Sequence, residues 1–158
     1  MTPGRRSRKP PAPCRDNRVS SASLAAMSYT FETSEPDNDG ILIVKIGGER
    51  PYLDVENVDE LLTFWSRMPD ELRAKNTRRI LALSTARGKV SSAAVLAFYQ
   101  CLCQLGFEPG VRLAVTVPDD ADRVFSIIQL GISVAADNGW NIGLFASELE
   151  ARQWLCLR

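Results

Sequence analysis

The fold is decided by the stretch Ile80–Leu105, which reads ILALSTARGKVSSAAVLAFYQCLCQL. Its first four residues form a continuous apolar run, which is typical of a strand that is buried on both faces of a sheet. From Ser91 onward the residues leave little polar surface at helical spacing, so they predict a largely buried helix. A short basic loop, Arg87-Gly88-Lys89, is expected to connect the strand to the helix.

The segments before this stretch predict a β-hairpin followed by an amphipathic helix. Tyr29–Thr33 alternates as a strand, and Ile41–Ile46 is a second strand that the following glycine pair should close. A helix that begins at Asp54 or Asn57 keeps the i, i+3, i+4 spacing of apolar residues. Pro69 is expected to end this helix, because a proline disfavours helical geometry in the residue before it.

Strand and helix patterns alternate after the central helix. Val111–Val117 predicts a strand, Val124–Ala135 a helix and Trp140–Phe145 a last strand. Ser147 and Glu150 match a capping box that opens the final helix. The whole order predicts an α/β domain in which a hairpin precedes βα repeats, with a mixed, mostly parallel five-stranded sheet and four main helices.

Residues 1–27 differ in composition from the rest of the chain. Their basic residues outnumber a single acid, Asp16, and apolar residues are rare before Leu24. A disordered basic segment is therefore expected, with the folded domain in residues 28–158. Three interpretations stay open: a basic interaction tail, a transit-type presequence, or a true start of translation at Met27.

Composition excludes several classes of function. The 19 Lys and Arg balance the 19 Asp and Glu, and the region after the basic segment is mildly acidic, which argues against binding of nucleic acid. The chain contains no His, which excludes Ser-His-Asp and Cys-His catalysis and His-ligated zinc. No nucleophile, base and oxyanion donor assemble in one place, so we expect no enzyme, no cofactor and no metal site.

The cysteines and the hydropathy pattern predict the cellular compartment of the protein. Cys101 and Cys103 are two residues apart in a helical pattern, so they point to different faces and are poorly placed for a disulfide. Reduced thiols in a cytoplasmic protein are the expected state. No segment is long and apolar enough to span a membrane.

Three features of the chain together carry a family resemblance. The strand Leu42–Ile46 ends in two glycines and precedes an amphipathic helix. The strand Ile80–Leu83 leads into Ser91–Leu96, SSAAVL, where anti-sigma-factor antagonists carry Asp-Ser-Ser-Gly and an apolar run. The ending Leu144–Leu155 reads LFASELEARQWL. Over about residues 29–155 the chain resembles the STAS domain, and more narrowly its SpoIIAA-like relatives.

This resemblance implies a role for Ser91 and Ser92. In the antagonists a serine at this helix start is phosphorylated by a partner kinase, which switches binding of an anti-sigma-like protein. A phosphate acts there by adding negative charge and acceptor oxygens to a surface that the partner must desolvate. Val90 and Ala93 stand where the family has an acid and a glycine. The alternative is that the two serines only cap the helix.

The connection between the central strand and helix is a candidate anion or partner site. Its residues are Ser84, Thr85, Arg87, Gly88 and Lys89. Two cations and the free N–H groups of a helix start can together hold a phosphate or a carboxylate. The alternative is a solvated loop beside a glycine turn.

Two functions of different classes fit these observations. The first is a regulatory module that binds a protein partner, under control of serine phosphorylation. The second is a carrier of a small apolar molecule, because the resemblance implies that some relatives bind lipid-like ligands. A carrier needs an enclosed apolar cavity under the helix Ser91–Leu105 that is large enough for a ligand. A partner module needs a filled core and an exposed apolar patch around Ser91.

Overall fold

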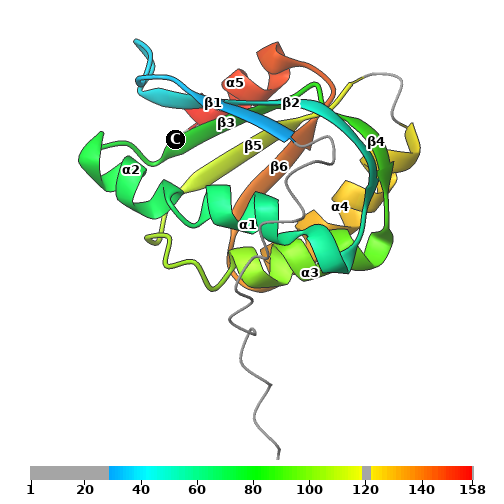
Figure 1. Cartoon of the computed structure of the whole chain (residues 1–158). Helices are drawn as coiled ribbons and strands as arrows, with labels where there is room; N and C mark the ends of the chain where they lie inside the picture. The colour runs from blue at the N-terminus through cyan, green and yellow to red at the C-terminus, as the bar shows by residue number, and fades with distance from the viewer. Residues whose placement is uncertain (1–28, 119–121, 158) are drawn as a thin grey trace, which may run out of the picture.

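The computed structural model describes residues 29–118 and 122–157 and has a six-stranded sheet with helices on both faces (Figure 1). The strands are β1 (Tyr29–Thr33), β2 (Ile41–Leu53), β3 (Arg79–Ser84), β4 (Arg87–Val90), β5 (Arg112–Thr116) and β6 (Asn141–Phe145). The helices are η2 (Val55–Asn57), α1 (Asp59–Trp65), α2 (Met68–Ala74), α3 (Ser92–Leu102), α4 (Asp122–Asp137) and α5 (Glu148–Cys156). The predicted α/β class is confirmed, and the basic segment 1–27 lies outside the described residues.

Five strands form one continuous path in the order β1-β2-β3-β5-β6. β1 is antiparallel to β2, and the other neighbouring pairs are parallel. This is the mixed, mostly parallel five-stranded sheet that the sequence predicts. β3 lies at its centre, where Ile80 pairs with Leu42 of β2 and with Leu113 of β5.

Alternate residues of the central strands enter two separate cores. Ile80 and Ala82 join the larger core, on the face that α1, α2, α3 and α4 cover (Figure 1). Leu81 points to the opposite face, where α5 packs. The buried members of this second core are Ile41, Leu81, Ala114, Ala151 and Leu155. Burial on both faces explains why β3 is a continuous apolar run.

β2 is longer than predicted, and its second half pairs with an additional strand. The sequence predicts that the pair Gly47-Gly48 ends β2, but the chain continues in extended form to Leu53. Gly48 takes φ +93°, which a glycine adopts without strain. The predicted basic loop is also wrong, because Arg87–Val90 forms β4 and pairs in parallel with β2. This pairing joins segments remote in sequence, so no local signal marks it.

The helix predicted to begin at Asp54 or Asn57 is divided into η2 and α1, and a further helix, α2, follows it. Asp54 caps η2 in a capping box with Asn57. Pro69 does not end the helix as predicted, but lies in the first turn of α2. A proline is tolerated there, because the N–H groups of a first turn have no partner within the helix.

Arg112 of β5 holds the C-terminal end of α5. Its guanidinium donates to the carbonyl oxygens of Trp154 at 2.6 Å and Leu155 at 3.2 Å, and also to that of Leu157. The guanidinium lies 4.3 Å from the centre of the Trp154 ring. A cation is favourable at this end of a helix, where carbonyl groups lack partners. One side chain thus fastens the last helix to the middle of the sheet.

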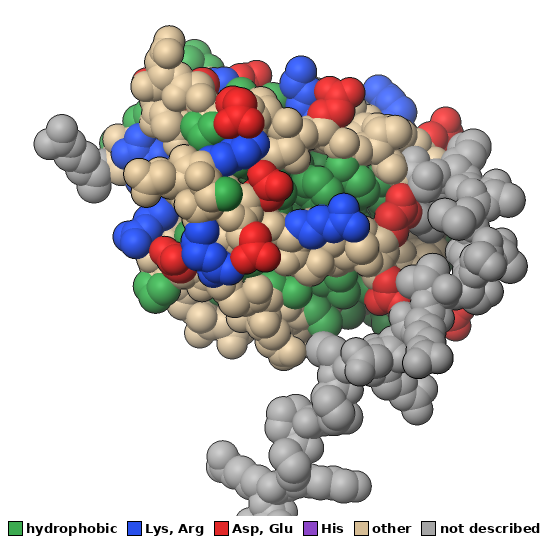
Figure 2. Space-filling view, turned by 60° about the vertical axis from the view of Figure 1, so that its left-hand side comes forward, with side chains coloured by type: hydrophobic (Ala, Val, Ile, Leu, Met, Phe, Trp, Pro, Cys, Tyr) green, Lys and Arg blue, Asp and Glu red, His purple; other side chains and the backbone are tan. Residues whose placement is uncertain are grey.

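Charges of both signs are mixed on the surface around α2. Figure 2 shows Lys and Arg side chains beside Asp and Glu side chains on this face. Lys75 lies between Glu35, at 3.1 Å, and Glu71, at 3.5 Å, and Arg73 pairs with Asp70.

Across the part of the chain that the structure describes, every helix is too short or too polar to cross a bilayer.

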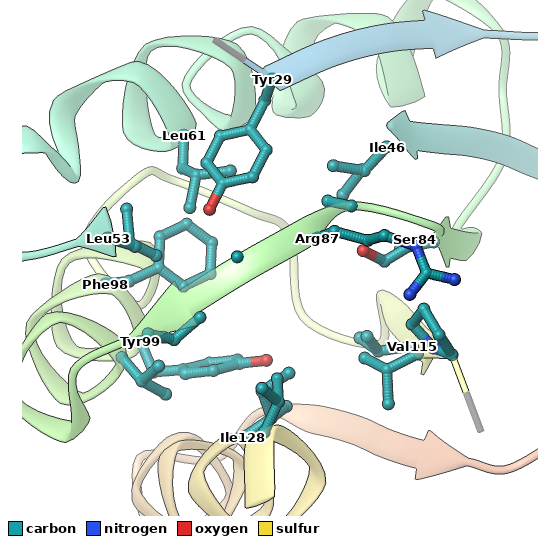
Figure 3. A pocket seen from close by; sticks show the side chains of 18 of the residues that line it. Tyr29, Ile46, Leu53, Leu61, Ser84, Arg87, Phe98, Tyr99, Val115 and Ile128 are labelled. Carbon is teal, nitrogen blue, oxygen red and sulfur yellow. The ribbon is translucent and has the colours of Figure 1, made fainter. Parts of the chain in front are cut away.

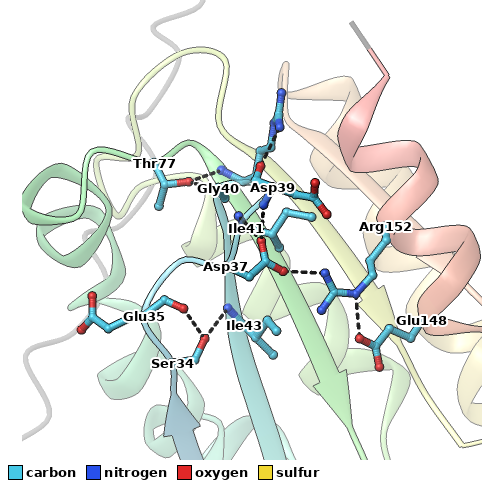
Figure 4. A network of polar contacts seen from close by, with 11 residues as sticks. Ser34, Glu35, Asp37, Asp39, Gly40, Ile41, Ile43, Thr77, Glu148 and Arg152 are labelled. Atoms are coloured by element: carbon cyan, nitrogen blue, oxygen red, sulfur yellow. Dashed lines mark hydrogen bonds and ion pairs between the residues drawn. The ribbon is translucent and has the colours of Figure 1, made fainter.

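An ion pair ties the turn between β1 and β2 to α5 (Figure 4). Arg152 donates to Asp37 at 2.5 Å and to Glu148 at 2.8 Å. The second oxygen of Asp37 accepts from the N–H groups of Asp39 and Ile41. Burial alone would raise the pKa of Asp37, but Arg152 and the two N–H donors outweigh it and hold the pKa below its ordinary value.

This pKa predicts how the stability of an Asp37→Asn variant depends on pH. A lowered pKa contributes stability above the unfolded-state value, and the contribution is lost as the pH falls through the folded-state value. At pH 7 the free energy of unfolding of the variant should therefore be about 1 kcal/mol lower than that of the wild type. The difference should shrink as the pH falls below about 4, in urea denaturation at a series of pH values.

The matched control is Asp70→Asn, which removes an ion pair whose carboxylate is 82% exposed. It should leave the unfolding free energy within about 0.5 kcal/mol of the wild type at every pH. A difference for Asp37→Asn that stays constant down to pH 2 would contradict the role given to its charge.

Candidate functional site

A cavity of about 280 Å³ lies between the sheet and the helices α1, α3 and α4 (Figure 3). The sheet contributes to its lining Ile46, Ala82, Leu113 and Val115, and the helices contribute Leu61, Trp65, Val95, Phe98, Tyr99, Val124 and Ile128. Ala82 is small and central in β3, so it leaves volume that a larger side chain would fill. The cavity has the position under α3 that a carrier requires.

Polar groups occupy only a few places in the lining. The hydroxyl-bearing residues are Tyr29, Ser84 and Tyr99, and Arg87 brings a guanidinium (Figure 3). Arg87 and Gly88 line the cavity and are also exposed, so they mark where it meets solvent. An apolar interior with a few placed polar groups is the usual character of a small-molecule site.

Tyr99 of α3 is a lining residue that also packs against α4. Its side chain is 5% exposed, and its hydroxyl points into the cavity (Figure 3). The ring lies against Gly131 of α4, where a Cβ atom would come within 2.3 Å of Tyr99 Cδ2. Burial raises the pKa of the Tyr99 phenol, so the hydroxyl keeps its proton. It therefore acts as a hydrogen-bond donor.

Ser91 and Ser92 differ in what they do at the start of α3. Ser91 is the N-cap, and its Oγ accepts from the N–H of Ala94 at 3.0 Å. The same Oγ lies 3.5 Å from Oδ1 of Asp54. Ser92 is the first residue of the helix and is exposed. The capping interpretation is confirmed for Ser91, and phosphorylation of either serine stays a prediction.

The candidate anion or partner site is split by the formation of β4. Ser84 is the last residue of β3, and the N–H of Thr85 donates to the carbonyl oxygen of Ile46 in β2 at 2.8 Å. The other three residues, Arg87, Gly88 and Lys89, belong to β4. Ser84, Arg87 and Gly88 line the cavity, whereas Thr85 and Lys89 are exposed outside its lining. The structure thus places Arg87 beside an apolar cavity rather than in a solvated loop. Anion binding by this group stays a prediction.

Tyr99 was not predicted as a site residue from the sequence. In an apolar helical pattern it counts as one more core position, since its ring buries like that of Phe98. One signal was present, because a buried Tyr needs a partner for its hydroxyl and no neighbour in the sequence supplies one. The lining residues from α1 and α4 had no such signal.

The described residues offer little for a metal ion or a disulfide. Within ranges 29–118 and 122–157, no cluster of His, Cys, Asp and Glu could hold a metal. Cys101 and Cys103 are half-buried, and neither is in a disulfide. Burial raises the pKa of Cys103, which keeps it a thiol rather than the reactive thiolate.

Comparison with known proteins gives one structural similarity. The sequence matches no protein-family model and has no significant match among curated proteins. A solved structure of an uncharacterised protein of the DUF3478 family from Shewanella loihica PV-4, described as having a SpoIIAA-like fold, is similar with a TM-score of 0.45 and 16% identity. The match covers 83% of this chain and 94% of that one. That description names the fold that the sequence resembles, and no statement about function follows from a similarity of this degree.

The cap at the start of α3 predicts different effects for its two serines. Ser91→Ala removes the acceptor for the N–H of Ala94 and should lower the unfolding free energy by about 1 kcal/mol. Ser92→Ala removes an exposed hydroxyl within the helix and should change it by less than about 0.5 kcal/mol. Urea denaturation measures both. Equal effects of the two substitutions would show that the cap does not stabilise α3.

Proposed function

We propose that this chain is a non-catalytic domain that binds a small apolar molecule between its sheet and the helices α1, α3 and α4. The cavity of about 280 Å³ carries this proposal. An engineered cavity of about 150 Å³ with an apolar lining stays dry and binds benzene. The present cavity is therefore large enough for a molecule about twice the size of benzene.

The character of the lining supports an apolar ligand. Side chains such as Leu113, Val115 and Ile128 offer no hydrogen bonds, so water inside the cavity would lack partners. A ligand that replaces it buries apolar surface against the sheet and the helices, which is favourable in proportion to the area removed from water. Arg87 and Gly88 lie where the cavity meets solvent and would flank the route of entry.

A protein interaction at the start of α3 is a second candidate function, and one observation favours it. Tyr52 and Val55 are 48% and 47% exposed. They flank Leu53, whose carbonyl oxygen accepts from the N–H of Ser91 at 2.9 Å. Two exposed apolar residues thus lie close in sequence to the residue whose backbone meets the start of α3, where Ser92 is exposed. This is the kind of patch that a partner module under serine phosphorylation would use.

The cavity predicts binding of an apolar probe. Isopropylbenzene at tenfold excess over its dissociation constant should raise the Tm of the wild type by about 4 °C. Val115→Phe should fill part of the cavity and remove this shift. Val134→Phe is the matched control, because Val134 is also half-buried but lies outside the lining. The proposal fails if the wild type shows no shift or if Val115→Phe keeps it.

The natural occupant can be sought by native mass spectrometry of protein purified from its own host. We expect an adduct that is lost under denaturing conditions. A covalent gain of one phosphate that maps to Ser91 or Ser92 would instead support the second candidate. The bare mass under both conditions would count against both functions.

A further inference from the structure

The side chain of Tyr99 is only 5% exposed, and within the described residues no protein group is recorded as a hydrogen-bond partner of its hydroxyl. It points into the cavity (Figure 3). Burial is the only cause that shifts the pKa of this phenol, which agrees with the absence of a polar neighbour. Buried polar groups in folded proteins are nearly always paired. A hydroxyl that faces the cavity and is not used by the protein is therefore available to an acceptor on a bound ligand.

The Tyr99 ring is fixed so that its hydroxyl has no other direction to take. On one side the ring lies against Gly131, so closely that no Cβ atom would fit between them. On another side Phe98 meets it edge to face, with ring centres 5.1 Å apart. Because α3 and α4 hold the ring in this way, the hydroxyl is preorganised for an acceptor inside the cavity.

The surroundings of the Tyr99 hydroxyl decide the charge of that acceptor. Ile128 lies near Tyr99 (Figure 3), and Val95 contacts the same glycine of α4 as the Tyr99 ring; neither side chain carries a polar atom. A carboxylate placed among them would lose its hydration without a counter-charge, which is strongly unfavourable. The guanidinium of Arg87 lies beside Ser84, where the cavity meets solvent (Figure 3). An uncharged oxygen is the acceptor that fits beside Tyr99.

We propose that the ligand is an apolar molecule with one uncharged oxygen acceptor, a ketone, ester or ether, which accepts a hydrogen bond from the Tyr99 hydroxyl. The inference rests on the proposed function and names the chemical class of its ligand. Tyr99 is then the residue that distinguishes such a molecule from a plain hydrocarbon. A site built around one buried donor discriminates strongly, because a hydrocarbon leaves that donor unpaired.

Two probes of equal size test this inference on the full chain. Acetophenone and isopropylbenzene share a phenyl ring and a branched substituent, but only acetophenone has a carbonyl oxygen. Dissociation constants for both are measured by NMR titration of the wild type and of Tyr99→Phe. The substitution should weaken acetophenone about tenfold and leave isopropylbenzene within about twofold. Tyr52→Phe is the control, because Tyr52 is exposed and outside the lining, and it should change neither constant.

The outcomes separate this inference from the proposed function. Equal weakening of both probes by Tyr99→Phe would overturn the acceptor and leave the apolar site standing. Failure of the wild type to bind either probe would overturn both. The ligand-free Tm is a second readout, because removal of a hydroxyl that bonds to no protein group should leave the Tm unchanged or raise it. A clear fall in that Tm would show that the hydroxyl already has a partner and would also overturn the inference.

Discussion

Both faces of β3 are buried, and the rest of the architecture follows from how each face is covered. Ile80 and Ala82 need a layer of helices on one side, and Leu81 needs another on the other side. A parallel sheet provides this, because each crossover between neighbouring strands lays a helix on a face. The hairpin of β1 and β2 supplies the strand on one side of β3, and β5 supplies the strand on the other. A shift of one residue in the register of a central strand would turn its side chains to the opposite faces and so disturb both cores.

The two faces are filled differently, and this difference creates the candidate site. On the α5 face, Ala114 and Ala151 are fully buried, which lets the helix lie close to the sheet. On the other face, Gly131 lets α4 approach the aromatic side chains of α3, while Ala82 leaves room above the sheet. An unfilled volume lowers stability relative to a packed core. The ligand that we propose would fill this volume and offset part of that cost.

The sequence predicts those features whose signals are local. The strands β3, β5 and β6 show their apolar runs, and the N-caps Ser91 and Ser147 show their hydroxyls one residue before a helix. The length of β2, the formation of β4 and the position of Pro69 depend on contacts between distant segments, so they were missed. The cavity is a difference between the volume enclosed and the volume of the side chains that fill it. No pattern in one segment reports that difference, and the role of Tyr99 appears only when α3 and α4 are seen together.

The dependence of one sheet face on α5 also bears on how the chain folds while it is being translated. Leu81 and Ala114 leave the ribosome well before Ala151 and Leu155, which cover them. Until then, the described part of the nascent chain holds an open apolar sheet surface of the kind that chaperones recognise. Arg112 also lacks its partners until α5 has been synthesised, because the carbonyl groups that its guanidinium binds are all in the last turn of α5 and just after it. Helix α5 therefore completes the cover of this face of the sheet.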